Sequence, residues 1–80
     1  MIDLAALRAL ASIAGRGTLA RAAAELGYTP SAVSQQVKRL EREVGTPLLS
    51  PAGRGVVLTP AGRALVEASG DVFAAVEMAS

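Results

Sequence analysis

The 80-residue chain contains no cysteine, no histidine and no tryptophan. Without cysteine it has no disulfide, no thiolate nucleophile and no zinc site built on sulfur. Without histidine it lacks the most frequent general base and the most frequent neutral metal ligand. We therefore expect no metal site, no cofactor and no enzymatic activity.

Aromatic residues are almost absent as well, since Tyr28 and Phe73 are the only two. The chain is nevertheless 51% hydrophobic, with a mean hydropathy of +0.40, which disfavours intrinsic disorder. Its length allows one small core, which must be built from alanine, leucine and valine. Small side chains of this kind suit closely packed helices.

The sequence also lacks a long apolar run. Its longest uncharged apolar stretch falls well short of the roughly 18 residues that a membrane-spanning helix requires. Met1 is followed by Asp3 rather than by a basic stretch, so no signal peptide is expected. These features predict a cytoplasmic protein without a membrane partner.

The net charge of +1 is unevenly distributed. Residues 1–63 carry all eight basic residues and four acids, a net charge of +4, whereas residues 64–80 carry three acids and no base, a net charge of −3. A basic body favours an anionic partner. Random scatter of charges along a short chain is the alternative explanation.

Start and stop signals divide most of the chain into helices. Asp3, Thr18 and Thr29 are candidate N-caps, and Thr59 precedes a proline in the same way as Thr29 does. A loop is expected at residues 15–17. The predicted helices span about residues 4–14, 19–26, 30–44 and 60 to the C-terminus.

A small β-hairpin is predicted before the last helix. Two short apolar runs, 48–50 and 55–58, flank the turn-forming residues 51–54. Arg54 would lie at the hairpin tip.

The third predicted helix has a polar and cationic outer face. The residues on that face are Ser31, Ser34, Gln35, Lys38 and Arg42. Short polar side chains near a helix N-terminus can approach base edges, glutamine can bond a base through two hydrogen bonds, and lysine can contact guanine or phosphate. Because Gly27 joins the second and third helices with almost no linker, the pair is typical of a helix-turn-helix. A generic helical domain with a solvated outer face is the alternative.

Three segments resemble the N-terminal domain of LysR-type transcriptional regulators. They are AAAELGYTPSAVSQQVKRLE (22–41), GTPLL (45–49) and RGVVLTPAG (54–62). The resemblance implies a mainly α fold: a winged helix-turn-helix of three helices and a hairpin over residues 1–58, then a long linker and dimerisation helix over 59–80. It also implies an effector-binding domain that normally follows. We expect this fragment to lack that domain and to have no small-molecule effector site.

Three positions depart from the family pattern. Leu49 stands where phenylalanine is usual and puts less bulk under the wing, and Pro51 stands where an arginine is usual. Pro30 stands where many members carry glutamine. One phosphate contact and one base-reading side chain are therefore expected to be missing.

The expected DNA interface combines the third helix, in the major groove, with the hairpin wing, near the minor groove. Arg54 would enter the minor groove, although a solvated loop arginine is the simpler reading. Thr18 and Thr29 could donate to phosphates, cap their helices, or do both. The complete expected set is Thr18, Thr29, Pro30, Ser31, Ser34, Gln35, Lys38 and Arg54.

The last helix carries an apolar seam that a domain ending near residue 58 cannot cover. Its members are Leu65, Ala68, Val72, Val76 and Ala79. Phe73 is expected at the edge of the same dimer interface, against the first helix of either subunit. The seam predicts a homodimer, and the antiparallel pairing that the resemblance implies makes an inverted repeat the expected target. A helix folded back on its own domain, in a monomer, is the alternative.

Two other functions compete with sequence-specific DNA binding. One is a protein-interaction and dimerisation module whose third helix contacts another protein. The other is an enzyme that uses carboxylates for acid–base catalysis. This function is disfavoured because the carboxylates lie on helix faces and the small chain leaves no volume for a pocket. These carboxylates are Glu25, Glu41, Glu43, Glu67, Asp71 and Glu77.

Overall fold

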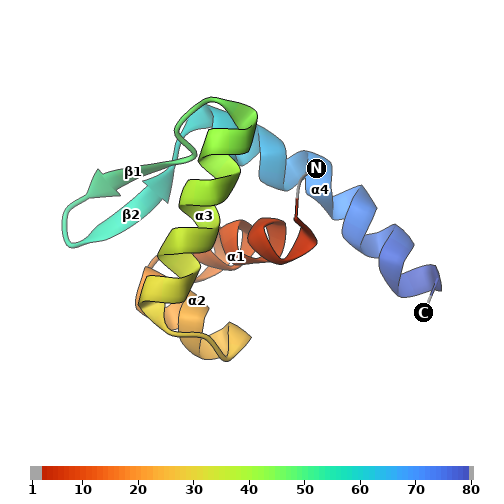
Figure 1. Cartoon of the computed structure of the whole chain (residues 1–80), viewed down its shortest axis with the longest axis horizontal. Helices are drawn as coiled ribbons and strands as arrows, with labels where there is room; N and C mark the ends of the chain where they lie inside the picture. Colours follow the sequence, from red (N-terminus) through yellow and green to blue (C-terminus); the bar gives the residue numbers. More distant parts are fainter. Residues whose placement is uncertain (1–2, 80) are drawn as a thin grey trace.

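The computed structural model describes residues 3–79 and shows the mainly α fold expected from the sequence. The elements are α1 (Leu4–Arg16), α2 (Leu19–Leu26), α3 (Pro30–Val44), β1 (Leu49–Ala52), β2 (Gly55–Leu58) and α4 (Pro60–Ala79). Figure 1 shows α1, α2, α3 and the hairpin as one body from which α4 extends. In the described range, no helix is both long enough and apolar enough to cross a bilayer.

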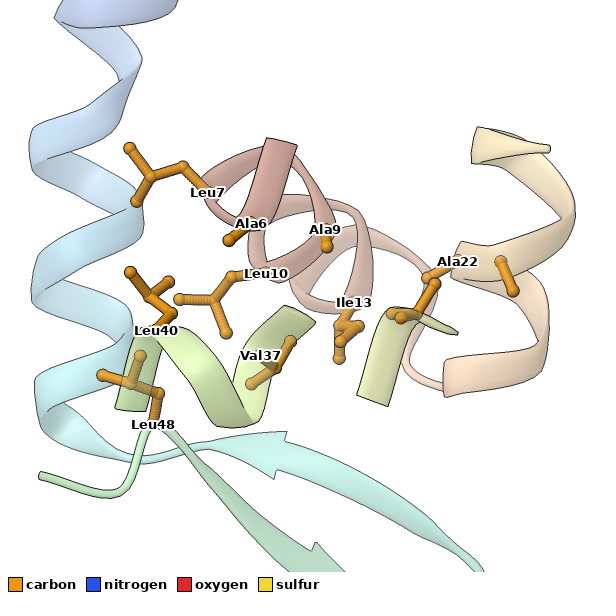
Figure 2. Packing of buried hydrophobic residues seen from close by; sticks show 11 residues of the cluster. Ala6, Leu7, Ala9, Leu10, Ile13, Ala22, Val37, Leu40 and Leu48 are labelled. Carbon is orange, nitrogen blue, oxygen red and sulfur yellow. The ribbon is translucent and has the colours of Figure 1, made fainter. Parts of the chain in front are cut away.

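The core lies where α1, α2 and α3 meet (Figure 2). Ala9 and Ala22 are fully buried in it, and their small side chains allow the helices to approach closely. Leu48, just before β1, closes the core beside α4. The buried set is Ala6, Leu7, Ala9, Leu10, Ile13, Ala22, Ala23, Val33, Val37, Leu40 and Leu48.

The first three helices begin at the capping residues predicted from the sequence. In each case a side-chain oxygen accepts a backbone N–H that would otherwise have no partner at the helix start. The bonds run from Ala5 N to Asp3 Oδ1 (2.9 Å), from Arg21 N to Thr18 Oγ1 (3.1 Å) and from Ala32 N to Thr29 Oγ1 (3.1 Å).

Helix α1 is longer than predicted. It passes through Gly15 to Arg16 and ends at Gly17, which has φ of 80° and donates its N–H to the carbonyl of Ile13 at 2.8 Å. The predicted loop at 15–17 was therefore wrong for residues 15 and 16, which are helical, and correct for Gly17. A glycine inside a helix costs only about 1 kcal/mol, whereas the left-handed cap at Gly17 satisfies a carbonyl at the helix end.

The hairpin has a tighter turn than predicted. Its strands pair antiparallel with Ala52 opposite Gly55, so only Gly53 and Arg54 form the loop, and Pro51 belongs to β1. Gly53 has φ of 60°, as the first central position of a type II′ turn requires. Proline is tolerated at position 51 because β1 is an edge strand.

Candidate nucleic-acid interface

The outer face of α3 presents the polar side chains expected from the sequence. Ser31, Gln35 and Lys38 are exposed and Ser34 is half-buried. The opposite face of the helix is buried against α1 and α2, so α3 can offer a partner only this polar side. In Figure 1, α3 lies across α1 at the front of the body.

Thr18 and Thr29 cap α2 and α3, but capping does not use their full hydrogen-bonding capacity. In both residues the hydroxyl oxygen accepts a backbone N–H. A threonine hydroxyl can accept and donate at the same time, so its proton can still be given to a phosphate. The two readings of these residues are therefore compatible.

A groove of about 420 Å³ brings together expected contact residues from three parts of the chain. Thr18 lies at the start of α2, Pro30 opens α3, and Arg54 comes from the hairpin tip. The hairpin reaches this position because Gly55 passes close to the α1–α2 turn, where a β-carbon would lie 3.2 Å from the carbonyl oxygen of Gly17. The remaining lining residues are Leu19, Ala20, Gly55 and Val56.

Arg42 extends the cationic face beyond the residues proposed as contacts from the sequence. It lies one helical turn after Lys38, and both side chains border an open hollow of about 530 Å³ together with Thr46. Glu41 also borders this hollow, but its Oε2 atom accepts the backbone N–H of Leu48 at 2.7 Å. The four-residue step from Lys38 to Arg42 was the sequence signal for this extension.

The carboxylates considered as acid–base candidates include two with structural hydrogen bonds. Besides Glu41, Glu25 accepts a bond from the hydroxyl of Ser12 at 2.8 Å and so links α2 to α1. Within residues 3–79 there is no group of three or more possible ligands that could hold a metal ion.

Some residues of the expected dimer interface pack against their own chain, and others are exposed to solvent. Leu65 and Phe73 are half-buried against their own chain, and the ring of Phe73 lies 5.0 Å from the guanidinium carbon of Arg8 on α1. Val72 and Val76 are 43% and 37% exposed. Ala68 and Ala79 are exposed as well. Thus α4 packs on its own body along one side and keeps a second, apolar side uncovered.

Known proteins share both the sequence and the fold of this chain. The family model described as "Bacterial regulatory helix-turn-helix protein, lysR family" matches residues 4–63. The transcriptional regulator DgdR of Burkholderia cepacia is 56% identical over 68 residues, which cover 84% of this chain. BudR of Klebsiella aerogenes is 47% identical over 66 residues, or 82% of this chain.

A solved structure described as a CbnR_DBD-DNA complex has a TM-score of 0.90 and 27% sequence identity, covering 96% of this chain and 88% of that one. The present chain spans 22% of the length of DgdR and 46% of that of BudR. The family match extends from the start of α1 into α4 and includes the helix-turn-helix and the wing. This chain therefore belongs to the LysR family of bacterial helix-turn-helix regulators.

Proposed function

We propose that this chain is the DNA-binding domain of a transcriptional regulator and recognises a specific double-stranded sequence. The observation that carries the proposal is the convergence of Thr18, Pro30 and Arg54 on one groove beside the exposed face of α3. A helix with a neighbouring cationic wing can engage a major groove and the adjacent minor groove together.

Within this interface each side chain has a distinct task. Ser34 and Gln35 approach the base edges, where glutamine can bond adenine through two hydrogen bonds. Lys38 contacts a phosphate or a guanine, and Arg54 enters the minor groove. Ser31 and the two capping threonines supply hydroxyl groups for backbone contacts, which set the position of the domain on the duplex.

We further propose that the chain acts as a homodimer through α4 and therefore reads an inverted repeat. The support is the uncovered apolar side of α4, which includes Val72 and Val76. A two-fold axis relating two reading helices places identical half-sites in opposite directions on the two strands.

Selection of DNA fragments by the purified chain tests the proposed function. Enriched fragments should share an inverted repeat, and the affinity for it should fall steeply as the salt concentration rises, because phosphate contacts release counterions. A duplex of the same composition with a scrambled sequence is the control. Equal affinity for the selected and scrambled duplexes would contradict sequence-specific recognition and would favour the protein-interaction module instead.

A further inference from the structure

We propose that Arg42 and Thr46, at the end of α3, hold a phosphate of the DNA backbone on the opposite side of the major groove from Thr29. The proposal rests on the DNA-binding function proposed above and adds two residues that the expected contact set does not contain. It assigns an occupant, a backbone phosphate, to the open hollow of about 530 Å³ at this end of α3.

The hollow is bordered by two cations whose charges are not paired within the described part of the chain. Lys38 and Arg42 are both exposed and lie one helical turn apart on the same face of α3. Among residues 3–79 neither of them forms an ion pair with a carboxylate. Thr46 is also exposed and adds a hydroxyl group to the border, just past the end of α3. An arginine can hold two oxygens of one phosphate at once, and a hydroxyl can donate to a third.

One acid, Glu41, borders the hollow, but its carboxylate is engaged elsewhere. Its Oε2 atom accepts the backbone N–H groups of Leu48 at 2.7 Å and of Leu49 at 3.4 Å. These bonds hold the carboxylate against the residues that lead into the wing, and the side chain is half-buried. The exposed charges at the border of the hollow are therefore those of Lys38 and Arg42, and both are positive.

The position of Arg42 along α3 fits a contact on the far side of the groove. Gln35, the proposed base-reading residue, lies six residues after Thr29 and seven residues before Arg42. At 1.5 Å per residue, Thr29 and Arg42 are about 20 Å apart along the helix. The major groove is about 12 Å wide, so a helix with Gln35 at its centre reaches both edges. Thr29 then faces the backbone of one strand, and Arg42 faces the backbone of the other.

Arg42 also has a simpler structural role available. It lies in the last turn of α3, where a positive charge is favourable beside the negative end of the helix dipole. That role affects the stability of the folded chain and needs no DNA. A test of the proposal must therefore follow an individual phosphate of the duplex as well as the overall affinity.

A scan with neutral phosphate analogues provides this test. Each phosphate of the selected duplex is replaced in turn by an uncharged methylphosphonate, and the affinity of the unmodified chain is measured. We expect losses at phosphates on both strands, on either side of the base pair whose preference changes in Gln35→Ala. In Arg42→Ala the loss should disappear at one phosphate of one strand and persist on the other strand. The affinity of Arg42→Ala for the natural duplex should fall about tenfold near 0.1 M salt, with a salt slope smaller by about one.

Two further variants test whether the arginine side chain and the hydroxyl act on the same phosphate. Arg42→Gln keeps a polar side chain without the charge and should give the same profile as Arg42→Ala. Thr46→Val removes the hydroxyl at nearly constant shape and should weaken the loss at that same phosphate. Arg39→Ala is the matched control, because it removes an exposed arginine of α3 that does not border the hollow. Its profile should retain the phosphate that Arg42→Ala no longer senses.

A lower stability of Arg42→Ala with an unchanged phosphate profile would leave Arg42 with the structural role alone and overturn the proposal. A profile of the unmodified chain in which all sensitive phosphates lie on one strand would also overturn it. Either result is compatible with a preference of the unmodified chain for the selected duplex. Equal binding of the selected and scrambled duplexes would instead contradict the proposed function itself.

Discussion

The backbone carbonyl of Leu48 occupies the place that a β-carbon on Gly62 would take. Gly62 is buried in the first turns of α4, and Leu48 leads into the wing. The hydroxyl of Thr59 strengthens this junction, since it donates to the carbonyl of Pro47 at 2.8 Å and accepts the N–H of Gly62 at 3.1 Å. The wing and α4 are therefore joined through direct backbone contact.

We predict that Gly62→Ala lowers the free energy of unfolding by roughly 1–3 kcal/mol, the usual cost of overpacking a filled site. The matched control is Gly70→Ala, because a β-carbon at position 70 meets nothing within 4 Å. The control should stabilise α4 by about 0.5–1 kcal/mol through helix propensity. Chemical denaturation measures the free energy of unfolding of both variants. Changes of the same sign and size in the two variants would contradict the close approach of Leu48 and Gly62.

Glu41→Ala should destabilise the entry to the wing. Its carboxylate accepts the N–H groups of Leu48 at 2.7 Å and Leu49 at 3.4 Å. Removing it leaves a part-buried donor without a partner, which costs about 1–3 kcal/mol. Glu43→Ala removes an exposed glutamate of the same helix and should change the free energy of unfolding by less than about 0.5 kcal/mol. Equal losses in thermal or chemical unfolding of the two variants would exclude this role.

Gln35→Ala and Lys38→Ala should weaken DNA binding in different ways. Loss of a base-reading glutamine should cost about 1–3 kcal/mol and relax the preference at one base pair. If Lys38 holds a phosphate, its loss should weaken all sequences alike and reduce the salt slope by about one. Titrations against duplexes with single base changes, at several salt concentrations, separate the two patterns. Wild-type binding by both variants would show that this face of α3 is not the reading surface.

Arg54→Ala should remove contacts that flank the region covered by α3, because the proposed interface places the wing tip in the adjacent minor groove. Footprinting should show weaker protection on the flanks and unchanged protection at the centre. Unaltered flanking protection would indicate that Arg54 is a solvated loop residue without a DNA contact.

Val72→Asp should dissociate the dimer and lower the affinity for a full inverted repeat much more than for a half-site. Ala74→Asp adds the same charge to an exposed position of α4 outside the seam and should leave the dimer intact. Sedimentation reports assembly, and titration of the two DNA targets reports its effect on binding. Equal sedimentation of the two variants would argue against the seam as the dimer contact.

The features that sequence reasoning predicted correctly are those determined within a few residues. Thr18 and Thr29 cap helices through bonds to N–H groups three residues ahead, so their role is visible in the local sequence. Gly15 and Gly17 show the limit of this approach, because either could end α1 and only packing and cap geometry decide between them.

Contacts between distant segments could not be predicted in this way. From the sequence Glu41 was considered only as a carboxylate on a helix face, and its bonds to the wing entry depend on how the chain turns back after α3. The groove that unites Thr18, Pro30 and Arg54 likewise exists only once the hairpin has packed beside α2.

The stack of Arg8 on Phe73 has a geometric consequence for the proposed dimer. It ties the middle of α4 to α1, at a distance of 5.0 Å, while Gly62 ties the beginning of α4 to the wing. Two separated attachment points on one rigid rod fix both its direction and its rotation. In the proposed dimer, two helices attached in this way would hold the two α3 helices at a fixed distance and orientation. We therefore expect the dimer to accept two half-sites only at one separation and one angular phase around the double helix.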